Sequence, residues 1–179
     1  MGEFGEFGEV GEFGEWVRGR VEVAKDPLKV VRDNLKDYAD RGVFRGFCEE
    51  PAGKTKSSFS FLWLTPRRMQ LVVDTDKECM TFKDLLPNVA SKSIIQKDIK
   101  RFLQARYDDA LPEHRRVDSK RGEISCTNRR GALSLSLNVK GGQYRYCLSK
   151  IVNLTHELFV HLGDYHDDYM CLNFEARQE

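Results

Sequence analysis

The stretch that decides the fold runs from Gly131 to Gly163 and opens with Ala132-Leu-Ser-Leu-Ser-Leu-Asn-Val139. Leucine or valine alternates here with serine or asparagine, which is the two-residue period of a strand with one apolar and one polar face. The polar face holds hydroxyl and amide groups instead of charges, so we expect it to face water or a partner. Alternation of this kind is typical of an antiparallel sheet that is covered on one side.

The period changes directly after this strand. Gly141 and Gly142 predict a turn, because glycine adopts backbone conformations that other residues avoid. Apolar residues then recur every three or four positions, the spacing of an amphipathic helix, and Gly163 predicts where this helix ends. The stripe consists of Cys147, Ile151, Leu154, Leu158 and Leu162. We expect it to lie on the leucine face of the strand.

The chain before this unit predicts a helix, a meander of strands and a second helix. The first helix starts at Asp26-Pro27, where a capping carboxylate precedes a proline, and ends at Gly42. Leu85-Leu86-Pro87 ends the extended pattern, and Ser91 caps the second helix, in which Ile94, Ile95, Ile99, Phe102 and Leu103 form the apolar stripe. Strands joined by short links make a meander. The predicted strands are residues 43–48, 58–65, 69–73, 79–82 and 123–127, and a short helix is predicted over 169–174.

Strands outnumber helices in this order and are joined by hairpins. The predicted class is therefore α+β, an antiparallel meander sheet of about five strands with helices packed on one face, in the order α-β-β-β-α-β-β-α. We expect no parallel dinucleotide-binding fold. At 179 residues the chain is predicted to hold a single α+β domain, residues 26–179, preceded by a low-complexity tail, residues 1–25.

The tail carries a triplet repeat over residues 2–16, in which Gly-Glu precedes phenylalanine, valine or tryptophan. A period of three fits neither a helix nor a strand. Fixing about 15 backbone residues costs about 15–30 kcal/mol, whereas full burial of the apolar side chains of the repeat returns only about 8–15 kcal/mol. We therefore expect the tail to be disordered on its own. It is either an aromatic segment that docks on a partner or a repeat without function.

The composition excludes several classes of function. Lys and Arg number 29, and Asp and Glu number 28, so the net charge of +1 gives no general attraction to nucleic acid or to an anionic membrane. No apolar run approaches the about 20 residues of a membrane-spanning helix, and the acidic N-terminus is unlike a secretory signal. We therefore expect a cytoplasmic protein that does not bind membranes.

The cysteines agree with that compartment and indicate no chemistry. They are an odd number and form no Cys-x-x-Cys pair, so we expect reduced thiols instead of disulfides. No histidine stands beside them in the sequence, and the glycine motifs of phosphate-binding loops and serine nucleophiles are absent. We therefore predict no catalytic residue and no cofactor. The cysteines are Cys48, Cys79, Cys126, Cys147 and Cys171.

Histidines and acids near the C-terminus form a candidate metal site. His156 and His161 are five residues apart, which places their rings about 140° apart around a helix, too far to share a zinc ion. His161, Asp164, His166 and Asp168 could together hold a divalent ion through imidazole and carboxylate ligands. No calcium-loop pattern accompanies them. A solvated helix junction without metal is the favoured interpretation, and a metal-binding protein or metal-dependent enzyme is the alternative.

Basic residues between positions 115 and 130 form a candidate nucleic-acid site. Their cations could meet phosphates, but no aromatic side chain is interleaved with the loop cations to stack on bases. Nucleic-acid binding is therefore a lesser alternative. The cations are Arg115, Arg116, Lys120, Arg121, Arg129 and Arg130.

The element order resembles that of the type III secretion chaperone-like fold, including the YbjN-type bacterial sensory-transduction-regulator family. The similar pieces are Leu85-Leu86-Pro87-Asn-Val before the second helix, and the strand, Gly-Gly turn and helix over 133–162. The resemblance covers roughly residues 26–174 and includes no signature motif. It implies a non-enzymatic bacterial protein, similar to small acidic chaperones that dimerise and hold extended segments of other proteins, or to regulators. This chain differs from such chaperones in its neutral charge and its tail.

The favoured function is a protein-binding module, either a chaperone-like protein or a regulatory adaptor, that forms a homodimer. In one predicted strand Phe59, Phe61 and Trp63 alternate with Leu62 and Leu64, so both of its faces are apolar. Helices on one side of the sheet cannot cover both faces, and an exposed apolar patch marks a partner site. We expect a segment of another protein, or a second copy of this chain, to cover it.

Overall fold

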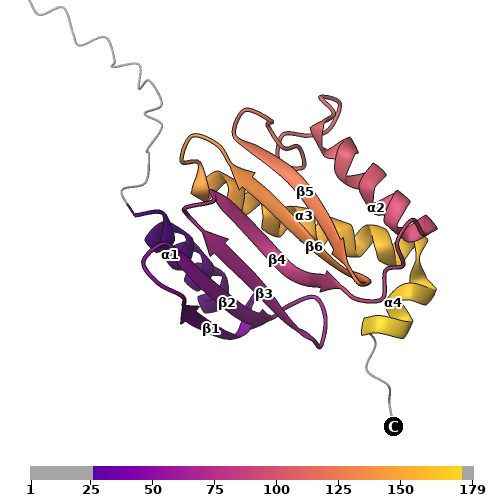
Figure 1. Ribbon diagram of the computed structural model, residues 1–179, viewed down its shortest axis with the longest axis horizontal. Helices are drawn as coiled ribbons and strands as arrows, with labels where there is room; N and C mark the ends of the chain where they lie inside the picture. Colours follow the sequence, from indigo (N-terminus) through magenta and orange to yellow (C-terminus); the bar gives the residue numbers. More distant parts are fainter. Residues whose placement is uncertain (1–25, 175–179) are drawn as a thin grey trace, which may run out of the picture.

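The computed structural model describes residues 26–174, which form an antiparallel sheet and a set of helices (Figure 1). The expectation of a disordered tail falls on residues 1–25 and lies outside the described residues. In chain order the elements are α1 (Pro27–Asp40), β1 (Arg45–Pro51), β2 (Lys56–Leu62), β3 (Arg68–Asp74), β4 (Cys79–Leu86), α2 (Ile94–Gln104), the 3-10 turn η1 (Ala105–Tyr107), β5 (Gly122–Arg129), β6 (Ala132–Val139), α3 (Tyr144–Tyr165) and α4 (Asp167–Phe174).

The sheet has six strands in the order β1-β2-β3-β4-β6-β5, and every neighbouring pair is antiparallel. The predicted α+β class is confirmed. Each of the six strands overlaps one of the strand ranges predicted from the sequence, whereas the predicted element order counted about five. The strand from Ala132 to Val139 has the predicted bounds, and it pairs with both β4 and β5. β1 and β5 form the two edges.

The helices form one layer on one face of this sheet. α3 contacts β4 and β6 as well as α1 and α4, and in Figure 1 α1 and α3 pass behind the strands. Leu133, Leu135 and Leu137 of β6 are fully buried beneath this layer, as the leucine alternation predicts. The opposite face, which carries the serines of β6, is covered by none of the described helices. We call it the open face.

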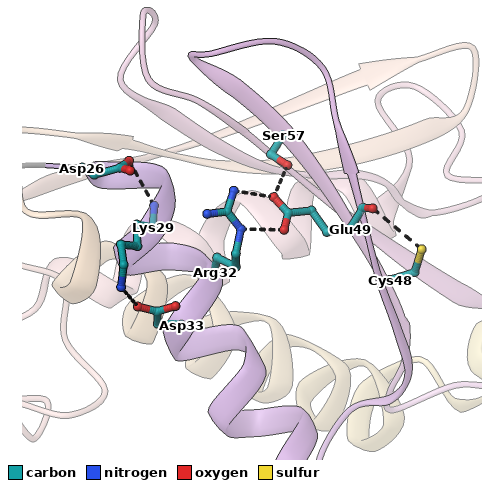
Figure 2. Close-up of polar contacts among 7 residues, drawn as sticks. All are labelled: Asp26, Lys29, Arg32, Asp33, Cys48, Glu49 and Ser57. Atoms are coloured by element: carbon teal, nitrogen blue, oxygen red, sulfur yellow. Dashed lines mark hydrogen bonds and ion pairs between the residues drawn. The ribbon is translucent and has the colours of Figure 1, made fainter.

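A network of polar contacts fastens α1 to the β1 side of the sheet. Figure 2 shows Arg32 of α1 with Nε 2.6 Å and Nη2 2.8 Å from the two carboxylate oxygens of Glu49. Ser57 donates to the same carboxylate at 2.8 Å. The hydrogen bond from Arg32 holds the pKa of Glu49 below its ordinary value, against the opposing effect of burial. Glu49 is therefore ionised at neutral pH and holds α1 to the edge of the sheet.

Helix ends follow the sequence at α1 but not elsewhere. The side chain of Asp26 caps α1 by accepting from the N–H of Lys29, as predicted. The cap of α2 is Ser93 and not Ser91, because the Ser93 hydroxyl accepts from the N–H of Gln96. α3 continues past Gly163 to Tyr165. The predicted stop is therefore wrong, because Gly163 does not take a left-handed conformation and His166 bonds back to Leu162.

Strand β4 is longer than predicted, and a bulge explains the difference. Its pairing with β6 shifts between Phe82 and Leu86, and Asp84 has a positive φ of 47° there. Past this irregularity Leu86 pairs with Leu133. Leu85 and Leu86 therefore belong to the strand and are both buried, whereas the sequence predicts that they end it.

The aromatic face of β2 lies in the core. Phe59 and Phe61 are fully buried, and Trp63 is half-buried against them. Leu62 is half-buried on the opposite side, and Leu64 in the following turn is 39% exposed. Of these five candidate partner-binding residues, the two phenylalanines therefore have no surface available to a partner of the single chain.

We expect Phe61→Ala to lower the free energy of unfolding by about 3–5 kcal/mol, the range for truncating a buried aromatic side chain. The ring of Phe61 is stacked on that of Phe44, with centroids 4.0 Å apart. Leu62→Ala removes a half-buried side chain next to it and should cost less than about 2 kcal/mol. Urea unfolding followed by circular dichroism measures both. Equal losses for the two variants would contradict the burial of the aromatic face.

Candidate binding groove between α2, α3 and α4

Exposed apolar side chains gather where the start of α2 faces the junction of α3 and α4. Ile94 is 79% exposed, Tyr165 71% and Val160 51%. The sequence predicts Ile94 in the buried stripe of α2, and this is wrong. Because the cap is Ser93, Ile94 is the first residue of the helix, and the buried positions of α2 are Gln96, Ile99, Phe102 and Leu103.

Two hollows lie beside these side chains and share Tyr165. The first has a volume of about 540 Å³ and is lined by Ile94, Ile95 and Tyr169, with Ser93, His166, Asp167 and Asp168. The second has a volume of about 380 Å³ and is lined by Val160 and Phe102 with the charged residues described below. We call the two hollows together the helical groove. Its dimensions fall in the range of ligand-binding clefts.

A carboxylate on α2 holds the two sides of the groove together. Oδ2 of Asp98 accepts hydrogen bonds from Nε2 of His161 at 2.8 Å and from Nε2 of His166 at 2.9 Å. His161 belongs to α3, and His166 is the residue that ends it. The ring of His161 also packs between those of Phe102, at 4.8 Å, and Tyr165, at 4.7 Å. Asp98 thus fastens α2 to the end of α3.

Burial raises the pKa of Asp98, but the hydrogen bonds from His161 and His166 outweigh it and hold that pKa below its ordinary value. The carboxylate is therefore ionised at neutral pH. Since the folded pKa lies below the unfolded one, Asp98 stabilises the fold above about pH 4. That contribution is lost as the pH falls through the folded pKa.

The structure arranges the predicted metal ligands differently from the sequence-based alternative. His161 and His166 both turn to Asp98, while Asp164 and Asp168 are exposed. Among residues 26–174, no group of three His, Cys, Asp or Glu side chains is placed to hold a metal ion. Sequence reasoning missed Asp98, although it is the one acid of α2.

A second cluster of charges lines the far hollow. The buried guanidinium of Arg106 pairs with Oε2 of Glu157, and Nε of Arg115 lies 3.0 Å from Oε1 of the same carboxylate. Arg106 also lies 4.2 Å above the ring of Phe102. Burial lowers the pKa of Arg106 more than Glu157 raises it. Glu157 therefore links α3 both to the turn after α2 and to the following loop.

The basic loop after α2 is largely paired within the chain. Besides Arg115, Arg116 lies 2.9 Å from Asp109, and Arg121 bonds to Gln143 at 2.8 Å and lies 3.7 Å above the ring of Tyr146. Phosphate binding uses cations that are not already paired within the protein. Arg115, Arg116 and Arg121 do not meet that condition. Lys120, and Arg129 and Arg130 at the β5–β6 hairpin, are exposed.

Comparison with protein-family models, with curated proteins and with solved structures found no match for this chain. The resemblance to the YbjN-type family therefore stays a prediction from element order and hydrophobic pattern. None of the helices within residues 26–174 combines the length and the apolarity that crossing a membrane requires.

We expect Asp98→Asn to lower the free energy of unfolding by about 1–3 kcal/mol at pH 7, because one charged acceptor serves two imidazoles. The gap between the variant and the parent chain should start to narrow at about pH 4, the ordinary pKa of an aspartate, and should close once the pH falls below the lower pKa that Asp98 has in the folded chain. Urea unfolding at a series of pH values measures both effects. Asp164→Asn, at an exposed position of α3, is the control and should leave stability unchanged. A gap that persists in acid would contradict the role of the ionised carboxylate.

Proposed function

We propose that this chain is a non-enzymatic protein-binding module, a chaperone-like or regulatory adaptor, that holds an apolar segment of another protein in the helical groove. One observation carries the proposal. Six large apolar side chains are exposed among residues 26–174, and three of them, Ile94, Val160 and Tyr165, line this groove. Grouped exposure of this kind marks interaction sites, whereas scattered apolar residues do not.

The chemistry of the groove suits a peptide with two apolar anchors. Each hollow offers aromatic and aliphatic walls, and Tyr165 stands between them. The rim carries both signs of charge, with Arg101 and Arg115 at the second hollow and Asp167 and Asp168 at the first. A central apolar contact surrounded by a polar rim is the usual anatomy of a protein interface.

The hydrogen bonds to Asp98 support this use of the groove, because they hold α2 and the end of α3 in place before a partner binds. α2 and the end of α3 are held by two hydrogen bonds to one carboxylate. A preformed site loses less conformational freedom on binding than a flexible one. The resemblance in element order to chaperones that hold extended segments favours the same function.

A nucleophilic role for Cys126 or Cys147 has little support. Burial raises the pKa of Cys126, and it raises that of Cys147 to about 11. Both side chains therefore stay protonated at neutral pH, and the thiol is a poor nucleophile compared with the thiolate. Both are placed for packing, since Cys147 is buried and Cys126 packs against the core.

We expect the full chain to select peptides with two apolar side chains from a library of random peptides displayed on phage. A selected peptide, labelled with a fluorophore, is then titrated by anisotropy. Ile94→Asp should weaken its binding by about tenfold or more, equivalent to about 1.4 kcal/mol. Leu172→Asp, a matched change at a position 82% exposed on α4 that does not line the groove, should leave binding unchanged. An equal loss in both variants, or no selection above background, would rule out the groove.

A further inference from the structure

The open face of the sheet is poor in charge at its centre. Strand register places twelve side chains of the six strands in its two middle rows, and two of them, Lys83 and Glu50 at the β1 edge, are charged. Charged residues make up 32% of the whole chain. The twelve are Cys48, Glu50, Ser58, Ser60, Gln70, Val72, Thr81, Lys83, Ser134, Ser136, Ser125 and Thr127. A face that only meets water has no reason to avoid charge in this way.

Five polar side chains of this centre are already hydrogen-bonded within the chain. The amide of Gln70 donates to the hydroxyl of Ser58 at 2.8 Å, and the hydroxyls of Thr81 and Ser136 are 2.8 Å apart. The hydroxyl of Ser134 accepts from the backbone of Asp84 at 2.9 Å. The main cost of burying polar atoms is the loss of their hydrogen bonds to water. These five side chains keep their partners when the face is covered, which lowers the cost of burying them.

The two ends of the open face carry opposite charges. Asp74 pairs with Cys79, Cys79 with Asn138, and Asn138 with Glu123, so both acids lie in one row across the sheet. At the other end lie Arg68, in the row of Leu62 and Arg45, and Arg129, at the last pair of β5. Two lysines reduce the net negative charge of the acidic end, since Lys56 pairs with Asp74 in the sheet and Lys140 lies 3.2 Å from Glu123.

From this pattern we infer that the open face is the interface of a homodimer, in which a second copy packs face to face with its strands reversed. The two-fold axis lies parallel to the sheet and perpendicular to the strands, at the level of Leu71. Each strand then faces its own copy running the opposite way, so Arg68 faces the partner's Asp74 and Glu123 faces the partner's Arg129. Every such contact occurs twice, because the interface is isologous. An axis parallel to the strands would place the basic ends on each other.

The extent of the open face is close to what a stable dimer requires. Six strands at about 4.8 Å spacing, each about seven residues long at about 3.3 Å per residue, make a flat patch of roughly 650 Å². Specific interfaces bury about 800 Å² on each partner, and side-chain relief adds to the flat value. Because its centre is hydroxylic and not apolar, we expect a dissociation constant in the micromolar range.

Sedimentation velocity of the full chain, over about 1–200 µM, tests the dimer itself. The mass should rise from that of one chain, 20.7 kDa, towards twice that value. Val72→Arg puts two cations into the centre of the interface and should leave a monomer throughout. Val160→Arg, the same change at the helical groove, should dimerise normally. A parent chain that stays monomeric, or a Val72→Arg variant that dimerises like the parent, would overturn the proposal.

Charge reversal tests the orientation of the two copies. Arg68→Glu and Asp74→Arg should each weaken the dimer by about tenfold or more, because like charges then face each other. The double variant restores opposite charges and should dimerise within about threefold of the parent. A double variant weaker than both single ones would exclude the reversed packing. Asp74 also accepts from the N–H of Lys77, so Glu123→Arg and Arg129→Glu repeat the test if circular dichroism shows that Asp74→Arg unfolds.

Discussion

The packing of α3 against the leucine face of β6 is the contact on which the rest of the structure depends. Leu133, Leu135 and Leu137 are fully buried there, as are Ile151 and Leu158 of the helix. α3 also touches α1, α4 and β4, so it connects nearly every part of the helical layer. A single layer of helices covers one side of a six-stranded sheet and leaves the other side bare. The open face and the helical groove at the end of α3 both follow from this arrangement.

Charged groups at the margin of the helical layer hold α2 and the segments after it against α3, in addition to apolar packing. Asp98 holds α2 to the end of α3 through two imidazoles, and Glu157 holds the turn and loop after α2 through Arg106 and Arg115. Each carboxylate serves two cationic or donor partners while partly buried. Removing one member of such a cluster leaves the others buried without compensation, which costs more than an exposed ion pair is worth. Polar side-chain contacts therefore contribute more to the position of α2, and hence to the groove, than they contribute to the sheet.

Sequence patterns predict those parts of the fold that depend on residues close together in the chain. Alternation over Ala132–Val139 admits one orientation of the strand, and Asp26 before Pro27 specifies a capped helix start, so both agree with the structure. The bulge in β4 arises because Leu86 pairs with Leu133, a partner distant in the sequence. Asp98 was missed for the same reason, since its imidazole partners lie more than 60 residues away. No periodicity within either segment could reveal these contacts.

A surface is harder to predict than a core, because its pattern depends on pairings between distant strands. The serines of β6 indicate a polar face by themselves, and that much follows from period two. Whether the acids on β3 and β5 stand in one row depends on three successive pairings, Asp74 with Cys79, Cys79 with Asn138 and Asn138 with Glu123. A slip of one residue in any of them would move a whole strand to the other face. The opposed charges of the open face are therefore a property of the assembled sheet. The strand register brings charged residues from distant parts of the chain into rows on one face, and these rows make the face self-complementary.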